Sequence, residues 1–124
     1  MLQAAIAACH ARARAATDTD WAQIAALYQA LTVLTPSPVV ALNRAVAVAM
    51  AESPERGLQI TDGLTAEPAL AGYQHLPSVR GDLLARLGRH REAAAEFRRA
   101  ASLTRNIPER TVLLQRAIDC EARL

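Results

Sequence analysis

The stretch that decides the fold runs from Gly81 to Ala100 and reads GDLLARLGRHREAAAEFRRA. Gly88 divides it into two segments in which small and bulky apolar residues recur three or four positions apart. Residues at that spacing share one face of a helix, and small side chains there let a neighbouring helix come close. The stretch therefore predicts two antiparallel helices that meet along one apolar seam. The seam residues are Gly81, Leu84, Ala93, Phe97 and Ala100.

This alternation of small and bulky residues is typical of the tetratricopeptide-type helical hairpin, a unit that stacks into open arrays. A weak internal repeat supports the interpretation, because Tyr28, Thr61 and Phe97 fall at equivalent places in successive hairpins. We therefore predict an all-α, tetratricopeptide-like superhelix of about three degenerate hairpins plus a C-terminal capping helix. Residues 1–124 are expected to form a single domain of this kind, and such arrays commonly hold other proteins.

The composition agrees with closely packed helices. Alanine is the most frequent residue, apolar residues make up 52% of the chain, and aromatic residues only 3%. Alanine has the highest helix propensity and keeps helix axes near one another, whereas β-branched and aromatic residues are too few for a sheet. The formal net charge of +2 gives little reason to expect nucleic-acid binding. All 14 basic residues are arginine, which fits a GC-rich genome, with selection for bidentate anion contacts as the alternative.

The hydrophobic periodicity and the helix-breaking residues predict seven helices. Five of them lie at about 2–16, 21–35, 38–51, 54–64 and 108–124. The fifth helix along the chain carries apolar residues over 79–87, and the sixth places residues 93, 97 and 100 inward. Residues 65–77 are expected to form a longer connection with one helical turn at most. The helix over 38–51 is apolar on nearly all sides, so we expect it in the middle of the protein, with Val39, Leu42, Val46 and Met50 on one side. We also expect Glu96 and Arg99 to pair on the outer face of their helix.

Five segments carry a more specific pattern. They are LQAAIAACH (2–10), TDWAQI (19–24), TPSPVVALNRAVAVA (35–49), LPSVRGDLLARLG (76–88) and NIPER (106–110). Together they closely resemble the C-terminal extension of a group of extracytoplasmic-function RNA polymerase sigma factors, and the resemblance covers nearly the whole chain. In that group the tetratricopeptide-like extension is regarded as regulatory and follows two domains that recognise the promoter and bind core polymerase.

The resemblance implies that this chain is a fragment of a longer sigma factor, because neither promoter-binding domain is visible in the sequence. It implies a role in transcription regulation through contacts with the factor's own N-terminal sigma domains, with the RNA polymerase core or with a regulator. Direct DNA binding by this fragment is not expected, since it shows no helix-turn-helix with a basic face. No signal peptide or membrane-spanning stretch is visible either, so we expect a cytoplasmic protein without membrane contacts.

The residues that we expect to contact a partner are polar or aromatic side chains on apolar helices and in the 65–77 connection. They are Asn43, Arg44, Tyr73, His75 and Arg80. An amide can grip a partner's backbone or carboxylate, and arginine pairs well with anions. For Asn43 the alternative is a structural hydrogen bond to a loop backbone. For Arg44 and Arg80 the alternative is an ion pair within the chain.

Asp20 closes the segment TDTD, whose oxygens are well suited to cap a helix. We expect His10 to bond to Asp20 and, with Trp21 adjacent, to pin the first hairpin. A catalytic set of Cys9, His10 and Asp20 is disfavoured, because consecutive residues on a helix point in different directions. The histidines and cysteines show no metal-ligand spacing, so we expect no enzyme, metal or cofactor. Cys9 and Cys120 lie at opposite ends of the chain and are expected to be free thiols.

Two other functions stay open at this point. The chain would also suit a stand-alone adaptor that binds a partner's peptide in its concave groove. A small-molecule sensor or enzyme would need a closed apolar pocket, which we would look for between residues 65–77 and the helix over 38–51. Homodimer formation through an exposed end helix is compatible with each of these functions.

Overall fold

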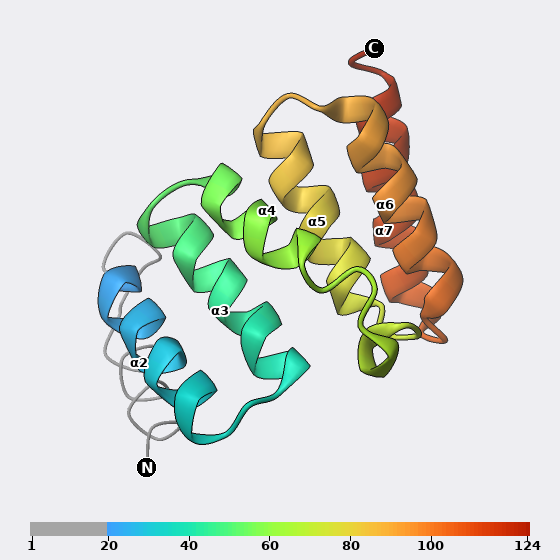
Figure 1. The fold of residues 1–124 in the computed structure, drawn as a ribbon. Helices are drawn as coiled ribbons and strands as arrows, with labels where there is room; N and C mark the ends of the chain where they lie inside the picture. The colour runs from blue at the N-terminus through green and yellow to red at the C-terminus, as the bar shows by residue number, and fades with distance from the viewer. Residues whose placement is uncertain (1–19) are drawn as a thin grey trace. The chain divides into compact units, whose positions relative to one another are not determined.

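The structure is a computed structural model that describes residues 20–124 (Figure 1). These residues form six α-helices and one short 3-10 helix and contain no strand, so the all-α class is confirmed. The elements are α2 (Trp21–Leu34), α3 (Pro38–Ala51), α4 (Pro54–Asp62), η2 (Pro68–Leu70), α5 (His75–Arg86), α6 (His90–Leu103) and α7 (Ile107–Glu121). The helix predicted over 2–16 lies outside the described residues. The tetratricopeptide-like superhelix stays a prediction.

The chain divides into two compact units, Met1–Ile60 and Thr61–Leu124, so that the boundary falls within α4. The prediction of a single domain over residues 1–124 stays a prediction. None of the helices between residues 20 and 124 is both long enough and apolar enough to cross a membrane.

In the first unit, α2 begins and ends where the sequence predicts. Asp20 caps its start, since one carboxylate oxygen accepts a hydrogen bond of 3.0 Å from the backbone N–H of Gln23. The helix ends at Leu34, shortly before Pro36, because proline disfavours the helical conformation in the residue ahead of it.

The contact between α2 and α3 is centred on Ile24, which is fully buried together with Ala47 of α3. Partly buried apolar residues of α2 pack around this pair. Ile24 and Leu31 are buried, and Trp21 and Tyr28 are half-buried, so these residues form one apolar stripe at helical spacing.

On another side of α3, the backbone of α4 comes close at Gly57. A Cβ atom built on Gly57 would lie 2.6 Å from the Cβ of Ala49 and 2.8 Å from the backbone oxygen of Ala45. No side chain fits in that space, so glycine is required for the close approach of the two helices. Helix α3 is therefore covered on two sides within this unit.

The expectation that α3 is buried nearly all round is wrong. Val39 and Met50 are 39% and 38% exposed, and Asn43 between them is exposed as well. These residues lie four and seven positions apart and so form one stripe along the helix. The residues predicted to share one side of this helix therefore differ in burial. Leu42 is buried and Val46 is half-buried, whereas Val39 and Met50 are exposed.

In the second unit, α5 and α6 pack along the predicted seam. Leu84 of α5 and the three inward residues of α6, Ala93, Phe97 and Ala100, are buried. The ring of Phe97 fills the space beside Gly81, where a Cβ atom would lie 2.8 Å from the ring. Gly88 joins the two helices with a φ of 77°, a left-handed conformation that glycine adopts without strain.

The connection before α5 is shorter than the predicted 65–77 segment. Its one helical turn is η2, and α5 already begins at His75. Pro77 therefore lies in the first turn of α5 and not in a loop. Proline is tolerated there because the first backbone N–H groups of a helix have no partner within the helix.

Helix α7 packs against α6 through Leu113, Ala117 and Cys120, which are buried. Its start is capped by Asn106, whose side-chain oxygen accepts a hydrogen bond of 2.9 Å from the N–H of Glu109. The other sides of α7 are not purely charged, because several large apolar residues of α7 and of the end of the chain are exposed. They are Ile107, Val112, Leu114, Ile118 and Leu124.

Candidate functional site

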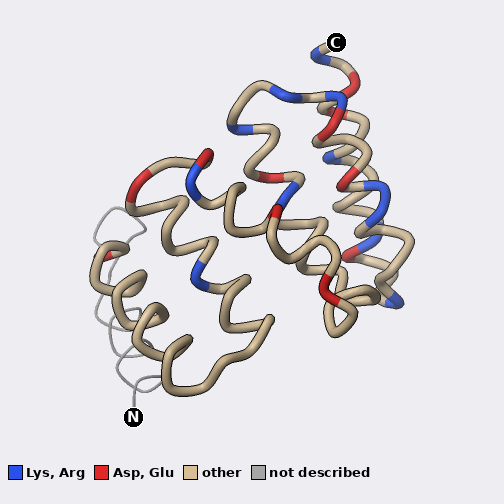
Figure 2. The backbone as a smooth tube through the Cα atoms, viewed as in Figure 1, with Lys and Arg blue, Asp and Glu red and all other residues tan. Residues whose placement is uncertain are grey.

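The predicted partner-binding residues do not form one cluster. Asn43 is exposed on α3 and makes no hydrogen bond to any described residue through its side chain, so the alternative of a buried amide bonded to a loop does not hold. Arg44, the next residue, is half-buried, and its Nε atom has no hydrogen-bond partner among the described residues. Arg44 is the one charged residue of α3, and α2 carries none, so the tube of Figure 2 is tan along both helices except for one blue segment on α3. The first unit therefore offers an apolar helix face with a single cation beside an exposed amide.

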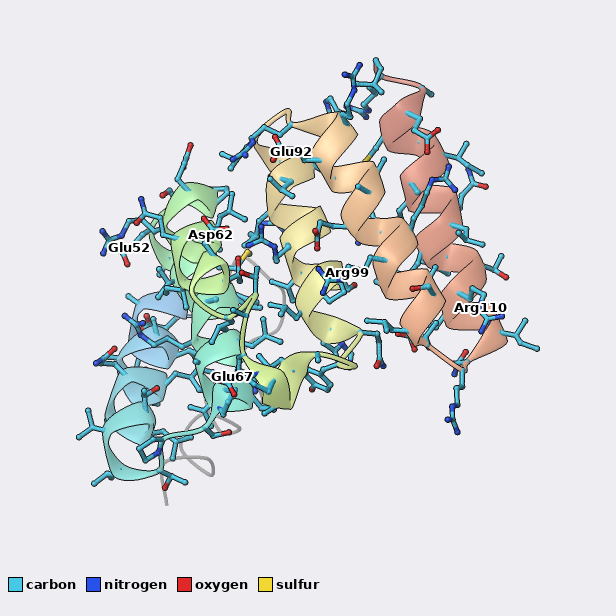
Figure 3. The ribbon with its side chains drawn as sticks, turned by 45° about the vertical axis from the view of Figure 1, so that its right-hand side comes forward. Glu52, Asp62, Glu67, Glu92, Arg99 and Arg110 are labelled. Carbon is cyan, nitrogen blue, oxygen red and sulfur yellow. The ribbon has the colours of Figure 1, made fainter. Side chains whose placement is uncertain are left out.

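Arg80 is engaged within the second unit. One terminal nitrogen donates hydrogen bonds to the hydroxyl of Thr61 at 3.0 Å and to a carboxylate oxygen of Asp62 at 2.6 Å. Asp62 lies at the end of α4 (Figure 3). The Nε atom lies 3.8 Å from a carboxylate oxygen of Glu96 on α6, and the Arg80 side chain is only 15% exposed. These contacts agree with the ion-pair alternative for Arg80.

The predicted pairing of Glu96 with Arg99 is wrong. The carboxylate of Glu96 faces Arg80 of α5, because Glu96 lies on a half-buried side of α6. Arg99 lies on the exposed side of the same helix (Figure 3). Thr61, which the repeat pattern aligned with Tyr28 and Phe97, is fully buried beneath the Arg80 side chain that bonds to it.

The other predicted residues that the structure describes are divided between the two units. Tyr73 and His75 contact each other edge to face, with ring centroids 5.1 Å apart. Trp21 belongs to the other unit and packs against the Ile24 cluster. Asp20 caps α2, and its predicted partner His10 lies outside the described residues.

The structure reveals a site that the sequence did not predict, a pocket of about 310 Å³ in the second unit. Three helices line it. The lining residues are Asp82, Ala85 and Arg86 of α5, His90 and Phe97 of α6, and Arg116, Asp119, Cys120 and Arg123 of α7 and the end of the chain. We call it the α5–α7 pocket.

The charges of the α5–α7 pocket are partly paired. The two oxygens of Asp82 bind two arginines, at 3.1 Å from Arg86 and at 2.8 Å from Arg116. The Arg116 guanidinium also lies over the Phe97 ring, 4.4 Å from its centroid, which is a favourable cation–π distance. Arg116 is thus held between a carboxylate and an aromatic face.

Other polar groups of the pocket lack such partners. Arg123 forms no ion pair with any described residue, whereas Asp119 accepts a hydrogen bond of 2.9 Å from the Gln115 amide. The Nδ1 atom of His90 is buried and has no hydrogen-bond partner among residues 20–124. Cys120 is a free, buried thiol. No three metal-binding side chains gather in the described part of the chain.

Sequence reasoning missed this pocket because its arginines resemble ordinary surface charges. Two signals were present. Asp82 and Arg86 are four residues apart, which is the spacing of a helical ion pair, and Arg116 and Arg123 are seven residues apart, about two helical turns. Neither signal says that the two helices share a neighbour, and this is why only the structure brings these side chains together.

Comparison with known proteins gives one informative relative. The chain is 51% identical over 108 residues to an uncharacterized protein of Rhizobium meliloti (strain 1021). The match covers 87% of this chain but only 25% of that protein, so the chain corresponds to a quarter of the relative's length. No family model matches the chain, and no solved structure matches it.

Proposed function

We propose that this chain is a regulatory protein-interaction region of an extracytoplasmic-function RNA polymerase sigma factor, and that it acts in the cytoplasm. Its partners are the factor's own N-terminal sigma domains or the polymerase core. The five sequence segments that resemble the extension of such factors support the proposal. The match to part of a much longer protein is compatible with a region that works within a larger chain.

The observation that carries the proposal is the exposed stripe of α3, formed by Val39, Asn43 and Met50. Two apolar side chains flank an exposed amide on a helix whose other sides are largely covered. Apolar surface of this kind can be buried against another protein, and the amide can donate to and accept from a partner's backbone. The neighbouring Arg44 would add a cation for an acidic group of the partner.

Regulation requires that the partner bind differently to the silent and the active state of the factor. A contact of equal strength in both states would change neither population. We therefore propose that the α3 stripe binds one arrangement of the promoter-binding domains more tightly than the other.

The experiment uses a full-length factor that contains this region. The double variant Val39→Glu/Asn43→Glu places two negative charges on the stripe, and we expect severalfold altered promoter-specific transcription in vitro, together with weaker binding in a pull-down of the partner domains. The control is Val112→Glu, which makes the valine-to-glutamate change at an exposed position of α7. Circular dichroism checks that the variants keep their helices. Unaltered transcription after removal of residues 20–124 would overturn the proposal.

A further inference from the structure

We propose that the α5–α7 pocket binds a small organic anion, with its oxyanion group on Arg123 and Arg116 and its apolar part against the pocket floor. The oxyanion is a carboxylate or a phosphate monoester. This inference concerns a different site from the α3 stripe and stands whether or not the proposed function is correct.

The charge of the lining points to an anion. The lining holds three guanidinium groups and two carboxylates, so these five side chains together carry an excess of one positive charge. Asp82 forms ion pairs with Arg86 and Arg116, whereas Arg123 forms none with any described residue. A guanidinium offers five N–H donors in a planar fork, so even Arg116 retains donors beyond those used on Asp82. A ligand with one oxyanion group fits this small excess better than a ligand with several such groups.

The floor of the pocket is apolar and rigid. Phe97 is fully buried, and Ala85 and Cys120 lie beside it in the lining. Because Arg116 stacks on the Phe97 ring while it bonds to Asp82, its guanidinium plane is held in one orientation. A donor fixed in this way loses little freedom when it binds a ligand. The ligand's apolar stem would rest on Ala85, which is partly exposed, because Phe97 itself is fully buried beneath Arg116.

The size of the pocket sets the size of the ligand. The volume of about 310 Å³ lies at the lower end of the range for small-molecule sites, which limits the ligand to one about the size of a substituted ring.

The test is amide-correlation NMR on the 124-residue chain, with phenyl phosphate and phenylacetate as the anionic probes. We expect saturable shift changes confined to the ends of α5, α6 and α7 that line the pocket. The neutral probe 2-phenylethanol should bind at least tenfold more weakly. Preference for phenyl phosphate or for phenylacetate identifies a phosphate ester or a carboxylic acid as the natural ligand, and either result supports the proposal. Equal binding of the neutral probe would show an apolar site and overturn it.

Two variants with opposite expected effects sharpen the test. Arg123→Gln removes the unpaired cation and should weaken phenyl phosphate binding about tenfold, as expected for the loss of one charge-assisted contact. Asp119→Asn removes a negative charge and should strengthen binding severalfold. The matched control is Arg91→Gln on α6, which neutralises an exposed arginine outside the pocket. If inorganic phosphate shifts Arg91 as much as the pocket residues, or if all three variants bind equally, the site is not specific and the proposal fails.

Discussion

At the scale of single residues, two glycines set the distance between helices. The space beside Gly57 is occupied by Ala45 and Ala49 of α3, and the space beside Gly81 is occupied by the ring of Phe97. In each case the neighbour is backbone or a buried side chain that cannot turn away. Gly72, by contrast, has no atom within 4 Å of the position where a Cβ would lie.

We predict that Gly81→Ala destabilises the second unit. The added Cβ would lie 2.8 Å from the fully buried Phe97 ring, and overpacking of this kind costs about 1–3 kcal/mol. Alanine's higher helix propensity returns about 1 kcal/mol, so the net loss should be up to about 2 kcal/mol. Urea unfolding followed by circular dichroism measures it. The same change at Gly72 should alter the free energy of unfolding by less than about 0.5 kcal/mol. Equal effects at the two glycines would contradict the packing argument.

Arg80 gives a second prediction at this scale. Its removal in Arg80→Met leaves the half-buried carboxylate of Glu96 without its cation and the hydroxyl of Thr61 without its donor. We expect a loss of about 2 kcal/mol in the free energy of unfolding, below the value for a fully buried pair because Asp62 is largely exposed to water. The double variant Arg80→Met/Glu96→Met should recover part of that loss, since no unpaired carboxylate remains. A double variant that is less stable than the single variant would show that the ion pair is not the cause.

At the scale of the helices, the start of α6 depends on one charged pair. Arg89 donates two hydrogen bonds to Glu92, from Nε at 2.9 Å and from a terminal nitrogen at 2.7 Å. These bonds favour the ionised carboxylate and lower the pKa of Glu92 from its usual value. Because the pKa is lower in the folded state than in the unfolded chain, the pair's contribution to stability is present above the unfolded pKa. It is lost as the pH falls through the folded pKa.

The corresponding prediction is that Arg89→Gln raises the pKa of Glu92 towards the value of an unpaired glutamate. Carbon-detected NMR of the side-chain carboxyl as a function of pH measures the change directly. The control Arg91→Gln removes a neighbouring exposed arginine that does not bond to Glu92, and it should leave that pKa nearly unchanged. A larger shift in the control than in Arg89→Gln would mean that general surface charge, and not the paired geometry, lowers the pKa.

Helix boundaries could be predicted well where the chain carries a strong breaker. Pro36, Pro38 and Gly88 fix the ends of α2, α3 and α5 through backbone constraints that act locally. The start of α5 differs from the prediction, because the helix begins at His75 and Pro77, the end of the predicted connection, occupies a first-turn position. The exposed side of α3 was also missed. A helix that is apolar all round has no periodicity from which its buried side can be determined.

At the scale of the whole molecule, the packing is between helices that follow one another in sequence, α2 with α3, α5 with α6 and α6 with α7. Patterns of this local kind can be read from a sequence, and this explains why the seam from Gly81 to Ala100 was predicted. The α5–α7 pocket was not, because its lining depends on how the sides of three helices meet around Phe97. Periodicity assigns a residue to a side of its own helix but does not say which charged side chains will share a cavity.

Because the chain divides into two compact units, we expect two distinguishable unfolding transitions, one for each unit. Trp21, the single tryptophan, reports on the first unit, whereas circular dichroism reports on both. Phe97→Ala should destabilise the second unit by about 3–5 kcal/mol. We expect the dichroism signal to fall at lower urea concentration while the midpoint of Trp21 fluorescence changes little.

The reciprocal variant is Ile24→Ala, which removes the centre of the first unit and should shift the Trp21 transition first. Coincident transitions by the two probes in both variants would show a single cooperative unit, because two-state unfolding requires all probes to agree.

The turn at Gly88 has a consequence for chirality. Its φ of 77° is the mirror image of the range that L-residues prefer. A D-residue therefore adopts this φ without strain. A chemically synthesised chain with D-alanine at position 88 should fold normally and restrict the backbone between α5 and α6. L-Alanine at the same position would strain the backbone there.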